Sequence, residues 1–584
     1  MARKEGVTFD NLFPKLYNIE LWFLAYQRIA PKPGNMTAGV DGKTIDGMGI
    51  RLISETIADL KASRYTPQPT RRVYLPKPNG KQRPLGIPCF RDKLLQTVVG
   101  LILEAIYEPT FADTSHGFRP QRSCHTALHE VKRMNGTRWW VEGDIKGFFD
   151  DLNHDTLLRI LGKRITDKRF LHLIQQFLRA GYAEAHQHHP TYSGTPQGGN
   201  LSPLLSNIYL NELDQAIAAK AVAFNQGTKR KKNPEYNVLH VRKYRAKKEA
   251  RRTGDWTRYK QLRKQHLQMQ PDDPQDPNFR RLTYVRYADD FLVGVIGSKA
   301  DAVALKQWLE EFLQTELHLE LSAEKTLISN ARQRVRFLGY DIKRWVGKRR
   351  IVRYPTKNGV ATKRSCTYQL ALLMPKEKCY TFARTYGNVT GWKGRCRSNL
   401  INLSDLEILM IYNAEVRGFL NYYALADNLK VIAANVLWLT TGSFFCTLAG
   451  KHKSSLAKEA GRWKHGTGRY AIEVRKADGN VREYALLSST KQIERNKIDN
   501  YPDKLPNTHK YRNRTELGQR LLANQCEWCQ SSEGLMEVHH IRKLGKLTRK
   551  TLWERQMIER RRKTMVLCVK CHDDLHAGRL RARQ

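Results

Sequence analysis

The sequence predicts a multidomain α+β chain with a mixed α/β body, an α-helical region after it and a small zinc-stapled module at the end. Three observations predict this organisation. At 584 residues the chain is too long for one hydrophobic core. From Arg71 to about Trp345, apolar runs alternate with turn signals. Near the end, four cysteines form two C-x-x-C pairs, which in a chain without a secretion signal favour a tetrahedral zinc site over disulfides.

The charge of the chain indicates a polyanionic partner. Lys and Arg number 101 against 56 Asp and Glu, a net charge of +45, while 41% hydrophobic and 9% aromatic residues are typical of a globular protein. No segment approaches the roughly 20 uninterrupted apolar residues of a membrane span, and the start "MARKEGVTFDNLF" lacks a signal-peptide apolar region. We therefore expect nucleic acid as the partner, no membrane, and a cytoplasmic location, with a bacterial host favoured over an organellar one.

The elements follow in chain order. "LYNIELWFLAYQRI" reads as a helix and leads into the Gly-rich loop "PGNMTAGVDGKT". The body is interrupted between Thr228 and Lys264, where 15 Lys or Arg face three acids, a composition that favours tracking of phosphates over a merely solvated face. After Pro375, "LSDLEILMIYNAEVRGFLNYYALADNL" has the apolar spacing of helices that face a core. From Lys451 to Gln519 the chain is polar and basic, which indicates a linker or a weakly ordered nucleic-acid module.

Three carboxylates form a candidate metal site in the body. "YVRYADDFLVGV" reads as two strands joined by a two-residue turn carrying Asp289 and Asp290, a costly pair among apolar neighbours unless a cation balances it. An ordinary solvated turn is the alternative. Asp144 follows the strand-like "RWWVEG", so it converges on the pair if the strands are neighbours, and the carbonyl of Ile145 could add a ligand. Two Mg²⁺ ions held there would activate a 3′ hydroxyl and stabilise a leaving pyrophosphate.

Two further stretches suit nucleotide binding. "RRVYLPKPNGKQRPLGIP" reads as a hairpin whose cations Lys77, Lys81 and Arg83 suit a triphosphate. The glycines of "SGTPQGGNLSPLLSNIYLNELD" let backbone approach a ligand closely, and the apolar helix after them would pack under the site.

The motifs taken in order resemble a known family. "PKPNGKQRPLGIP", "DIKGFFD", "GTPQGGNLSPLLSNIYL", "YADD", "LSAEKT" and "FLGY" together resemble the reverse transcriptase of a bacterial or organellar group II intron. "YNAEVRGFLNYY" resembles the thumb, or maturase domain, of that family, and "AGVDGKT" resembles its N-terminal loop that touches template or intron RNA. The resemblance implies a right-hand polymerase with a mixed α/β palm between fingers and an α-helical thumb.

The resemblance also implies roles for individual residues. Asp144, Asp289 and Asp290 would bind the catalytic metals, and Lys77 and Arg83 would contact the incoming triphosphate. Phe149 falls at the position of the bulky gate that excludes a ribose 2′ hydroxyl, and Gln197 lies in the loop beside the incoming nucleotide. Two alternatives stay open, since Phe149 could be a core residue and Gln197 could only stabilise its loop.

The C-terminal module offers two metal sites. Cys526, Cys529, Cys568 and Cys571 would hold a structural zinc ion. His539, His572 and His576 would hold one Mg²⁺, while the adjacent His540 deprotonates a water. This pattern resembles the HNH, or ββα-metal, DNA endonuclease, although Lys563 and Thr564 stand where many such modules carry Asn. A structural zinc finger that binds DNA without cutting it is the alternative.

The resemblance implies a domain organisation for the whole chain. We expect an N-terminal RNA-binding extension over 1–60, fingers and palm over 61–375 with a basic insert over 228–280, a thumb over 376–450, a basic linker and DNA-binding region over 451–520, and the endonuclease over 521–584.

The implied function is that of a mobile-intron protein. It would assist splicing of its intron RNA, with one protein on each RNA, then nick target DNA and extend the new end with dNTPs. Two other classes stay open. One is an RNA-binding splicing cofactor with an inactive polymerase, which the intact YADD and Asp144 disfavour. The other is a non-intron reverse transcriptase with an attached nuclease, which the retained "YNAEVRGFLNYY" disfavours.

Overall fold

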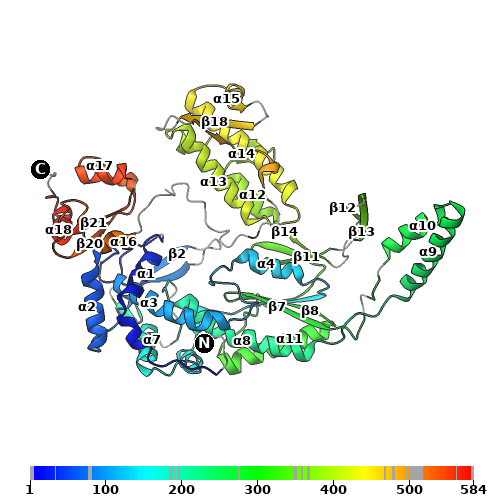
Figure 1. The fold of residues 1–584 in the computed structure, drawn as a ribbon, viewed down its shortest axis with the longest axis horizontal. Coiled ribbons are helices and arrows are strands. Elements are labelled where there is room, and N and C mark those ends of the chain that lie inside the picture. Colours follow the sequence, from blue (N-terminus) through cyan, green and yellow to red (C-terminus); the bar gives the residue numbers. More distant parts are fainter. Residues whose placement is uncertain are drawn as a thin grey trace.

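Figure 1 shows the computed structural model of the chain. The residues that the structure describes are 6–32, 34–76, 80, 82–184, 187–189, 191, 193–194, 198–269, 271–273, 276–345, 351–356, 359–364, 369–465, 469–475, 481–494, 498, 517–560 and 562–580.

A four-stranded antiparallel sheet forms the centre of the body. Its order is β7 (Arg281–Tyr287), β8 (Asp290–Ile296), β4 (Trp139–Asp144) and β9 (Ile328–Asn330). Side chains alternate between its two faces, so Phe291 and Val293 join one hydrophobic cluster while Leu292 joins the other. The long helices α8 (Ser202–Phe224) and α11 (Lys299–Leu317) cover one face, and α4 (Cys124–Arg133) covers the opposite face (Figure 1). The sheet is therefore buried on both sides, as its apolar strands predict.

A second sheet lies toward the N-terminal helices. Its order is β3 (Gln82–Ile87), β2 (Thr70–Pro76), β5 (Tyr182–Glu184) and β6 (Gln187–His189), and β2 and β3 form the hairpin expected from the sequence. Besides α4, the helices that precede β5 in the chain are α1 (Ile19–Ile29), α2 (Ile50–Lys61), α3 (Phe90–Tyr107), α5 (Phe148–Asp151), α6 (His154–Gly162) and α7 (Lys168–Arg179).

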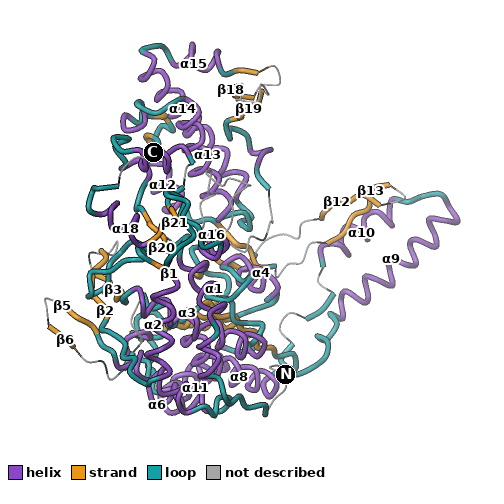
Figure 2. Tube along the Cα trace, turned by 60° about the vertical axis from the view of Figure 1, so that its left-hand side comes forward, coloured by secondary structure: helices purple, strands orange, loops and turns teal. Residues whose placement is uncertain are grey.

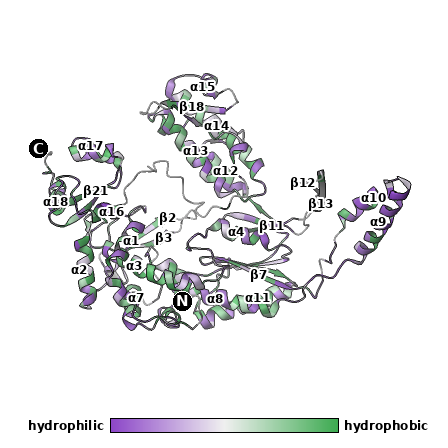
Figure 3. Cartoon of the chain, viewed as in Figure 1, coloured by the Kyte–Doolittle hydropathy of each residue, from purple (hydrophilic) through white to green (hydrophobic). Residues whose placement is uncertain are grey.

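The basic interruption folds as a helical hairpin. It consists of α9 (Pro234–Thr253) and α10 (Thr257–Gln268), which extend away from the body in both Figure 1 and Figure 2. Leu239, Ala246 and Ala250 of α9 are buried, whereas hydrophilic residues cover much of the hairpin (Figure 3). The hairpin begins at a narrow base, where the Asn233 N–H donates to the Pro271 carbonyl at 2.9 Å.

A helical unit follows the sheets, as the apolar spacing predicts. Its long helices are α13 (Asp405–Tyr422), which begins with a capping box of Ser404 and Glu407, and α14 (Leu429–His452). Part of the stretch expected to be a basic linker folds against this unit. The reason is apolar: Trp463, Leu486 and Leu487 from that stretch are buried in the cluster that α13 and α14 form.

The remaining elements of the body and the helical unit are short. They are η1 (Phe13–Tyr17), η2 (Glu108–Thr110), β10 (Val335–Phe337), β11 (Tyr340–Arg344), β12 (Ile351–Thr356), β13 (Gly359–Arg364), β14 (Leu370–Leu373), α12 (Lys376–Arg384), β15 (Gly387–Asn388), β16 (Lys393–Gly394), η3 (Ser398–Leu400), α15 (Leu456–Arg462), β17 (Lys464–His465), β18 (Arg469–Arg475), β19 (Val481–Ala485) and η4 (Thr490–Gln492).

Helix α14 corrects the expectation that no segment of the chain approaches the length and apolar composition of a membrane span. It is long and apolar enough to cross a membrane by length and composition, and 56% of its most apolar window is buried inside the protein. The buried residues include Val436, Phe444 and Leu448, which pack in the core of the helical unit. A core helix of this kind passes the same test as a membrane span.

The C-terminal module is not a separate body. It contains α16 (Leu517–Leu522), β20 (Met536–His540), η5 (Leu544–Lys546), α17 (Leu552–Glu559), β21 (Thr564–Cys568) and α18 (Val569–His576). The short strand β1 (Met48–Gly49) from the N-terminal part pairs antiparallel with β20, in the order β1-β20-β21. Figures 1 and 2 both place the module beside α1, and its Leu521, Trp528 and Val538 belong to the same hydrophobic cluster as the N-terminal helices.

Candidate active sites

The predicted carboxylates meet at one end of the central sheet. Asp144 is the last residue of β4 and pairs in register with Asp290, the first residue of β8. The turn consists of Ala288 and Asp289, so Asp290 opens the strand rather than sharing the turn as the sequence suggested. Ala288 adopts a left-handed φ of 58°, which makes the reversal as tight as a two-residue turn requires.

The electrostatics of this group suit a divalent cation. Burial, together with the charges of Asp289 and Asp144, raises the pKa of Asp290 to about 7, and burial also raises the pKa of Asp289. Lys325 donates to Asp144 across 2.7 Å. In the described part of the chain, the groups whose ligand atoms all lie within 4.8 Å of one another are the four cysteines and Asp46 with three histidines, and the three aspartates are not among them. The aspartates are therefore partly desolvated and raise one another's pKa, with a lysine partly compensating their charge.

Ile145 and Phe149 follow Asp144 closely in the sequence. Ile145 is buried. The Asp144 carbonyl accepts from the Ser322 N–H and the Lys146 N–H donates to the Glu320 carbonyl. Neither bond uses the Ile145 carbonyl. Phe149 in α5 is half-buried and contacts Phe148 edge to face, with 5.4 Å between ring centroids. Phe149 thus has one side in the core, and its position is compatible with both roles that the sequence allows.

The predicted nucleotide contacts are placed only in part. Arg83 is exposed on β3, close enough to the carboxylates that its charge lowers the pKa of Asp289 against the larger effect of burial. Lys77, Lys81 and Gln197 lie outside the described residues.

Gly194 and Gly198, which flank Gln197 in the sequence, approach neighbouring backbone closely. At Gly194 a Cβ would meet the Asp150 carbonyl oxygen at 2.6 Å, and at Gly198 it would meet the Gly86 carbonyl oxygen at 2.5 Å. Both have φ in the left-handed region, at 83° and 111°. These two glycines therefore approach α5 and β3, whereas the sequence suggested an approach to a ligand.

A buried ion pair behind the turn is a feature that the sequence reasoning missed. Arg286 and Asp214 are both fully buried and form a bidentate pair, with bonds of 2.8 and 2.6 Å. Arg286 also donates to the Ala288 carbonyl at 2.8 Å, and Tyr284 donates to Asp214 at 2.8 Å. The signal was the charged residue inside the apolar strand of "YVRYADD", but its partner lies 72 residues away.

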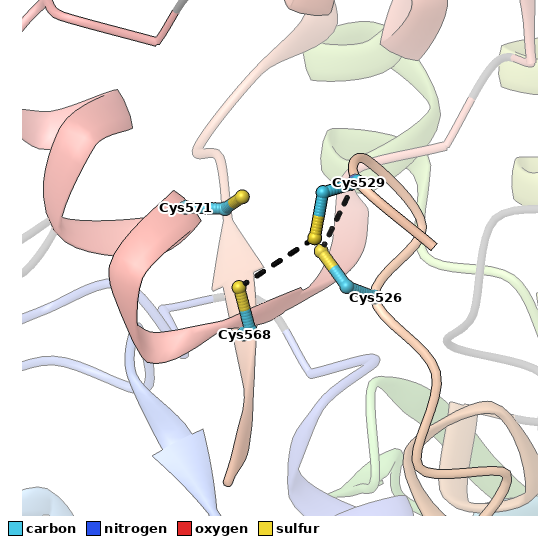
Figure 4. Close-up of side chains that lie close together, drawn as sticks. All are labelled: Cys526, Cys529, Cys568 and Cys571. Atoms are coloured by element: carbon cyan, nitrogen blue, oxygen red, sulfur yellow. Dashed lines mark hydrogen bonds between the residues drawn. The ribbon is translucent and has the colours of Figure 1, made fainter. Parts of the chain in front are cut away.

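The four cysteines of the C-terminal module converge (Figure 4). All four sulfur atoms lie within 4.8 Å of one another, and those of Cys529 and Cys568 are 3.8 Å apart. Burial opposes ionisation of Cys529, but hydrogen bonds from the Ser531 backbone and from neighbouring thiols lower its pKa. Four sulfur donors in one closed cluster are the set that structural zinc sites use.

The predicted histidine ligands also converge. His539, His572 and His576 bring ring nitrogens within 4.8 Å of one another, together with a carboxylate oxygen of Asp46. Glu537 accepts from Nδ1 of His572 at 2.8 Å, which leaves Nε2 facing the cluster. Among the described residues, neither ring nitrogen of the buried His539 makes a well-aligned hydrogen bond, and its Nδ1 lies 3.3 Å from Asp46 Oδ1. An ion fits this donor set, although three imidazoles favour a transition metal more than Mg²⁺.

The expected base, His540, lies on the same strand with its own partners. It is buried, and its Nε2 is 2.6 Å from the Tyr26 hydroxyl. Burial lowers the pKa of His540 to about 4, which keeps the imidazole neutral. Thr564, at the position where Asn was expected, pairs directly with His540 across the sheet and accepts from Arg520 at 3.0 Å. Lys563 contributes only a backbone carbonyl here, which accepts from the Ile541 N–H.

Comparisons with known proteins agree with this arrangement. Residues 75–246 match the family "Reverse transcriptase (RNA-dependent DNA polymerase)", residues 377–513 match "Type II intron maturase", and residues 526–572 match "AI2M/AI1M-like, HNH endonuclease".

Several curated proteins are similar over long stretches. "Group II intron-encoded protein LtrA" of Lactococcus lactis subsp. cremoris is 40% identical over 593 residues, covering 98% of this chain and 97% of that protein. "Protein YkfC" of Escherichia coli is 33% identical over 65% of this chain and 91% of its own length. "Nuclear intron maturase 2, mitochondrial" of Arabidopsis thaliana is 24% identical over 82% of this chain and 70% of its own length. With its three matched regions in this order, the chain belongs to the group II intron-encoded proteins, which combine an RNA-directed DNA polymerase, a maturase and an HNH DNA endonuclease.

Proposed function

We propose that Asp144, Asp289 and Asp290 form the metal site of a right-hand polymerase. In this assignment the sheet β7-β8-β4-β9 is the palm, the sheet β3-β2-β5-β6 belongs to the fingers, and the unit around α13 and α14 is the thumb. The observation that carries the proposal is the register of Asp144 with Asp290 beside a tight turn that holds Asp289. Two Mg²⁺ ions, when bound, supply the positive charge that activates a 3′ hydroxyl and stabilises the leaving pyrophosphate.

The residues around the carboxylates select and hold the nucleotide. Arg83 on β3, with Lys77, neutralises the triphosphate of the incoming dNTP. Phe149 blocks the space that a ribose 2′ hydroxyl would need, and Gln197 packs beside the nucleotide. Lys325, which lies 2.7 Å from Asp144, yields its place when cations bind.

The C-terminal module acts as a DNA endonuclease in this proposal. His539, His572 and His576 would hold one divalent ion, either Mg²⁺ or a transition metal. His540 would accept the proton of the attacking water. Glu537 fixes the ring of His572 so that Nε2 faces the ion. The four cysteines hold Zn²⁺ and keep the loop at Cys526 and Cys529 attached to the start of α18.

The partners follow from the charge and from the maturase match. We propose that the chain binds its intron RNA as one protein per RNA, with the basic hairpin α9–α10 along phosphates, and that this particle then binds target DNA. The particle would work in the bacterial cytoplasm, at the nucleoid when it acts on DNA. Nicking of the target by the module would then supply the 3′ end that the polymerase extends.

Removing the palm carboxylates tests the polymerase assignment. Asp289→Ala with Asp290→Ala should abolish primer extension on a generic RNA template and leave RNA affinity within about twofold, because the basic surface is unchanged. The control is Asp155→Ala, an exposed aspartate on α6 that should extend primers like wild type. Undiminished synthesis by the double variant would reject the metal-site assignment.

Removing the proposed base tests the endonuclease assignment. His540→Ala should lower nicking of target DNA by about 100-fold or more, the contribution of a general base. Zinc content, measured on the purified protein, should stay at the wild-type value because the cysteines are untouched. A variant that still nicks at the wild-type rate would rule out His540.

Sequencing the RNA that copurifies with the protein tests the maturase assignment. One dominant structured RNA, spliced faster in the presence of either wild-type protein or Asp289→Ala, supports it. A heterogeneous RNA population without assisted splicing would favour a reverse transcriptase with an attached nuclease.

A further inference from the structure

A carboxylate from the other end of the chain lies inside the histidine cluster. Asp46 Oδ2 is 2.8 Å from His576 Nε2, and its Oδ1 is 3.3 Å from His539 Nδ1 and 3.4 Å from His572 Nε2. Both oxygens of Asp46 therefore face the three side chains proposed as ligands. A carboxylate oxygen with three imidazole nitrogens is a complete set of four ligand atoms for one divalent ion.

The backbone holds Asp46 in this position. Asp46 precedes β1, whose Met48 pairs with Val538 of β20, and the Gly47 N–H donates to the Val538 carbonyl at 3.2 Å. The His540 N–H donates to Asp46 Oδ1 at 2.6 Å. Gly47 has φ of 78°, and at Gly49 a Cβ would lie 2.5 Å from the Met536 carbonyl oxygen. The two glycines let this segment lie directly against the endonuclease strand.

The proposed base, His540, is covered by a side chain of the N-terminal helix α1. The Tyr26 hydroxyl of α1 is 2.6 Å from His540 Nε2, and both side chains are buried, with His540 only 4% exposed. A scissile phosphate and its attacking water need both an open position on the ion and a free nitrogen on the base. In this arrangement Asp46 takes the first, and the Tyr26 hydroxyl occupies Nε2, one of the two ring nitrogens of His540.

We propose that Asp46 is a fourth ligand of the endonuclease ion and that the N-terminal segment formed by 19–32 and 34–49, by placing Asp46 and Tyr26, closes the nuclease site until DNA displaces it. The inference rests on the proposed endonuclease function. Closure and cleavage compete for one position on the ion, because a phosphodiester oxygen of DNA would bind where the Asp46 carboxylate oxygen lies. The ion is retained between cleavage events, and the module does not cut while the segment is docked.

Manganese binding measures the ligand directly. The probe is Mn²⁺ added to full-length protein carrying Asp289→Ala and Asp290→Ala, so that the palm carboxylates do not contribute. Echo-detected EPR then reports nitrogen modulation from coordinated imidazole. In this background Asp46→Asn should raise the Mn²⁺ dissociation constant about 10-fold or more, and should raise the nicking rate at saturating Mn²⁺. Asp10→Asn, an exposed aspartate in the same part of the chain, should change neither.

The outcomes separate this inference from the function it rests on. Wild-type Mn²⁺ affinity in Asp46→Asn, with nitrogen modulation abolished in His572→Ala, would overturn Asp46 as a ligand and keep the endonuclease site. Weaker binding combined with slower nicking at saturating Mn²⁺ would overturn closure, since Asp46 would then assist cleavage. Unchanged modulation in His572→Ala would reject the proposed metal site itself.

Tyr26→Phe gives a test that touches no ligand. The variant keeps the ring packed on α1 and removes only the hydroxyl that contacts His540. Nicking should become faster while the Mn²⁺ dissociation constant stays unchanged. A nicking rate equal to that of wild type would show that Tyr26 does not restrain the base.

Discussion

Arg286 bonds to the turn between β7 and β8, and its substitution should lower the rate of DNA synthesis. Lys in its place keeps the charge but has no planar fork to bind Asp214 and the Ala288 carbonyl together. We expect Arg286→Lys to lower the maximal rate of DNA synthesis about 100-fold, the effect of misplacing a reacting group by about 1 Å. The KM for dNTP should change little, because Arg286 touches no nucleotide. Steady-state primer extension with varied dNTP measures both.

The matched control for Arg286 is another ion pair of the chain. Arg397→Lys disturbs the Arg397–Glu415 pair of the helical unit, where the bond is 2.7 Å. It should lower the melting temperature without lowering the rate of synthesis. If Arg286→Lys also affects only melting, the pair is structural and does not position the turn.

At the residue scale, the sequence predicts those site residues that adjacent letters define. Asp289 with Asp290, the two C-x-x-C pairs and His539 with His540 are each visible in a few consecutive residues. The structure brings the four cysteines together and places His539 with His572 and His576. Asp214 and Asp46 could not be found in this way. Their partners lie 72 and 494 residues away, and an aspartate in a helix or a turn is ordinary by itself.

At the scale of elements, the basic hairpin α9–α10 is a part that can be removed. Its ends meet where Asn233 bonds to Pro271, so a short Gly-Ser linker in place of 234–269 should leave the body folded. RNA affinity should fall about 10-fold or more at physiological salt, and the slope of log affinity against log salt should become shallower by about one for each phosphate that the shortened protein no longer neutralises. Filter binding at several salt concentrations measures both quantities.

A charge variant separates phosphate binding from shape. Lys248→Gln, Arg251→Gln and Arg252→Gln change three exposed positions of α9 and keep the helix. This triple variant should show part of the decrease in the salt dependence of RNA affinity that the deletion of the hairpin causes. RNA binding like that of wild type in both variants would mean that the hairpin is a solvated projection. The sequence predicts the charge of this insert but not its helices. Its many basic residues leave few apolar positions, so the helical spacing of apolar residues is weak.

At the scale of the whole molecule, the two ends of the chain form one sheet, and locking them together should silence the nuclease. Met48 and Val538 are paired across β1 and β20, so cysteines at both positions are in register for a disulfide. The oxidised Met48→Cys, Val538→Cys protein should lose nicking and keep primer extension, and a reductant should restore nicking. Each single variant, treated in the same way, controls for oxidation of the four clustered cysteines. A locked protein that nicks like wild type would show that DNA enters without separation of the strands.

The sequence predicts the order of the regions but not this pairing between them. Helical and strand patterns are local, whereas β1 has only two residues and carries no pattern. Trp528 and Leu521 likewise look like the start of an independent core, yet they pack with the N-terminal helices. The same lack of local signal explains why the sequence predicts 1–60 and 521–584 as separate domains.

The pairing of β1 with β20 also sets an order of events during synthesis. Asp46 and its bonding partner His540 are 494 residues apart, which at about 5–20 residues per second means about 25–100 s of translation. For that time Met48 and Asp46 are exposed on a nascent chain whose sheet cannot yet close. An RNA that reaches this segment early meets it without competition from the endonuclease, so assembly with RNA can precede completion of the nuclease site.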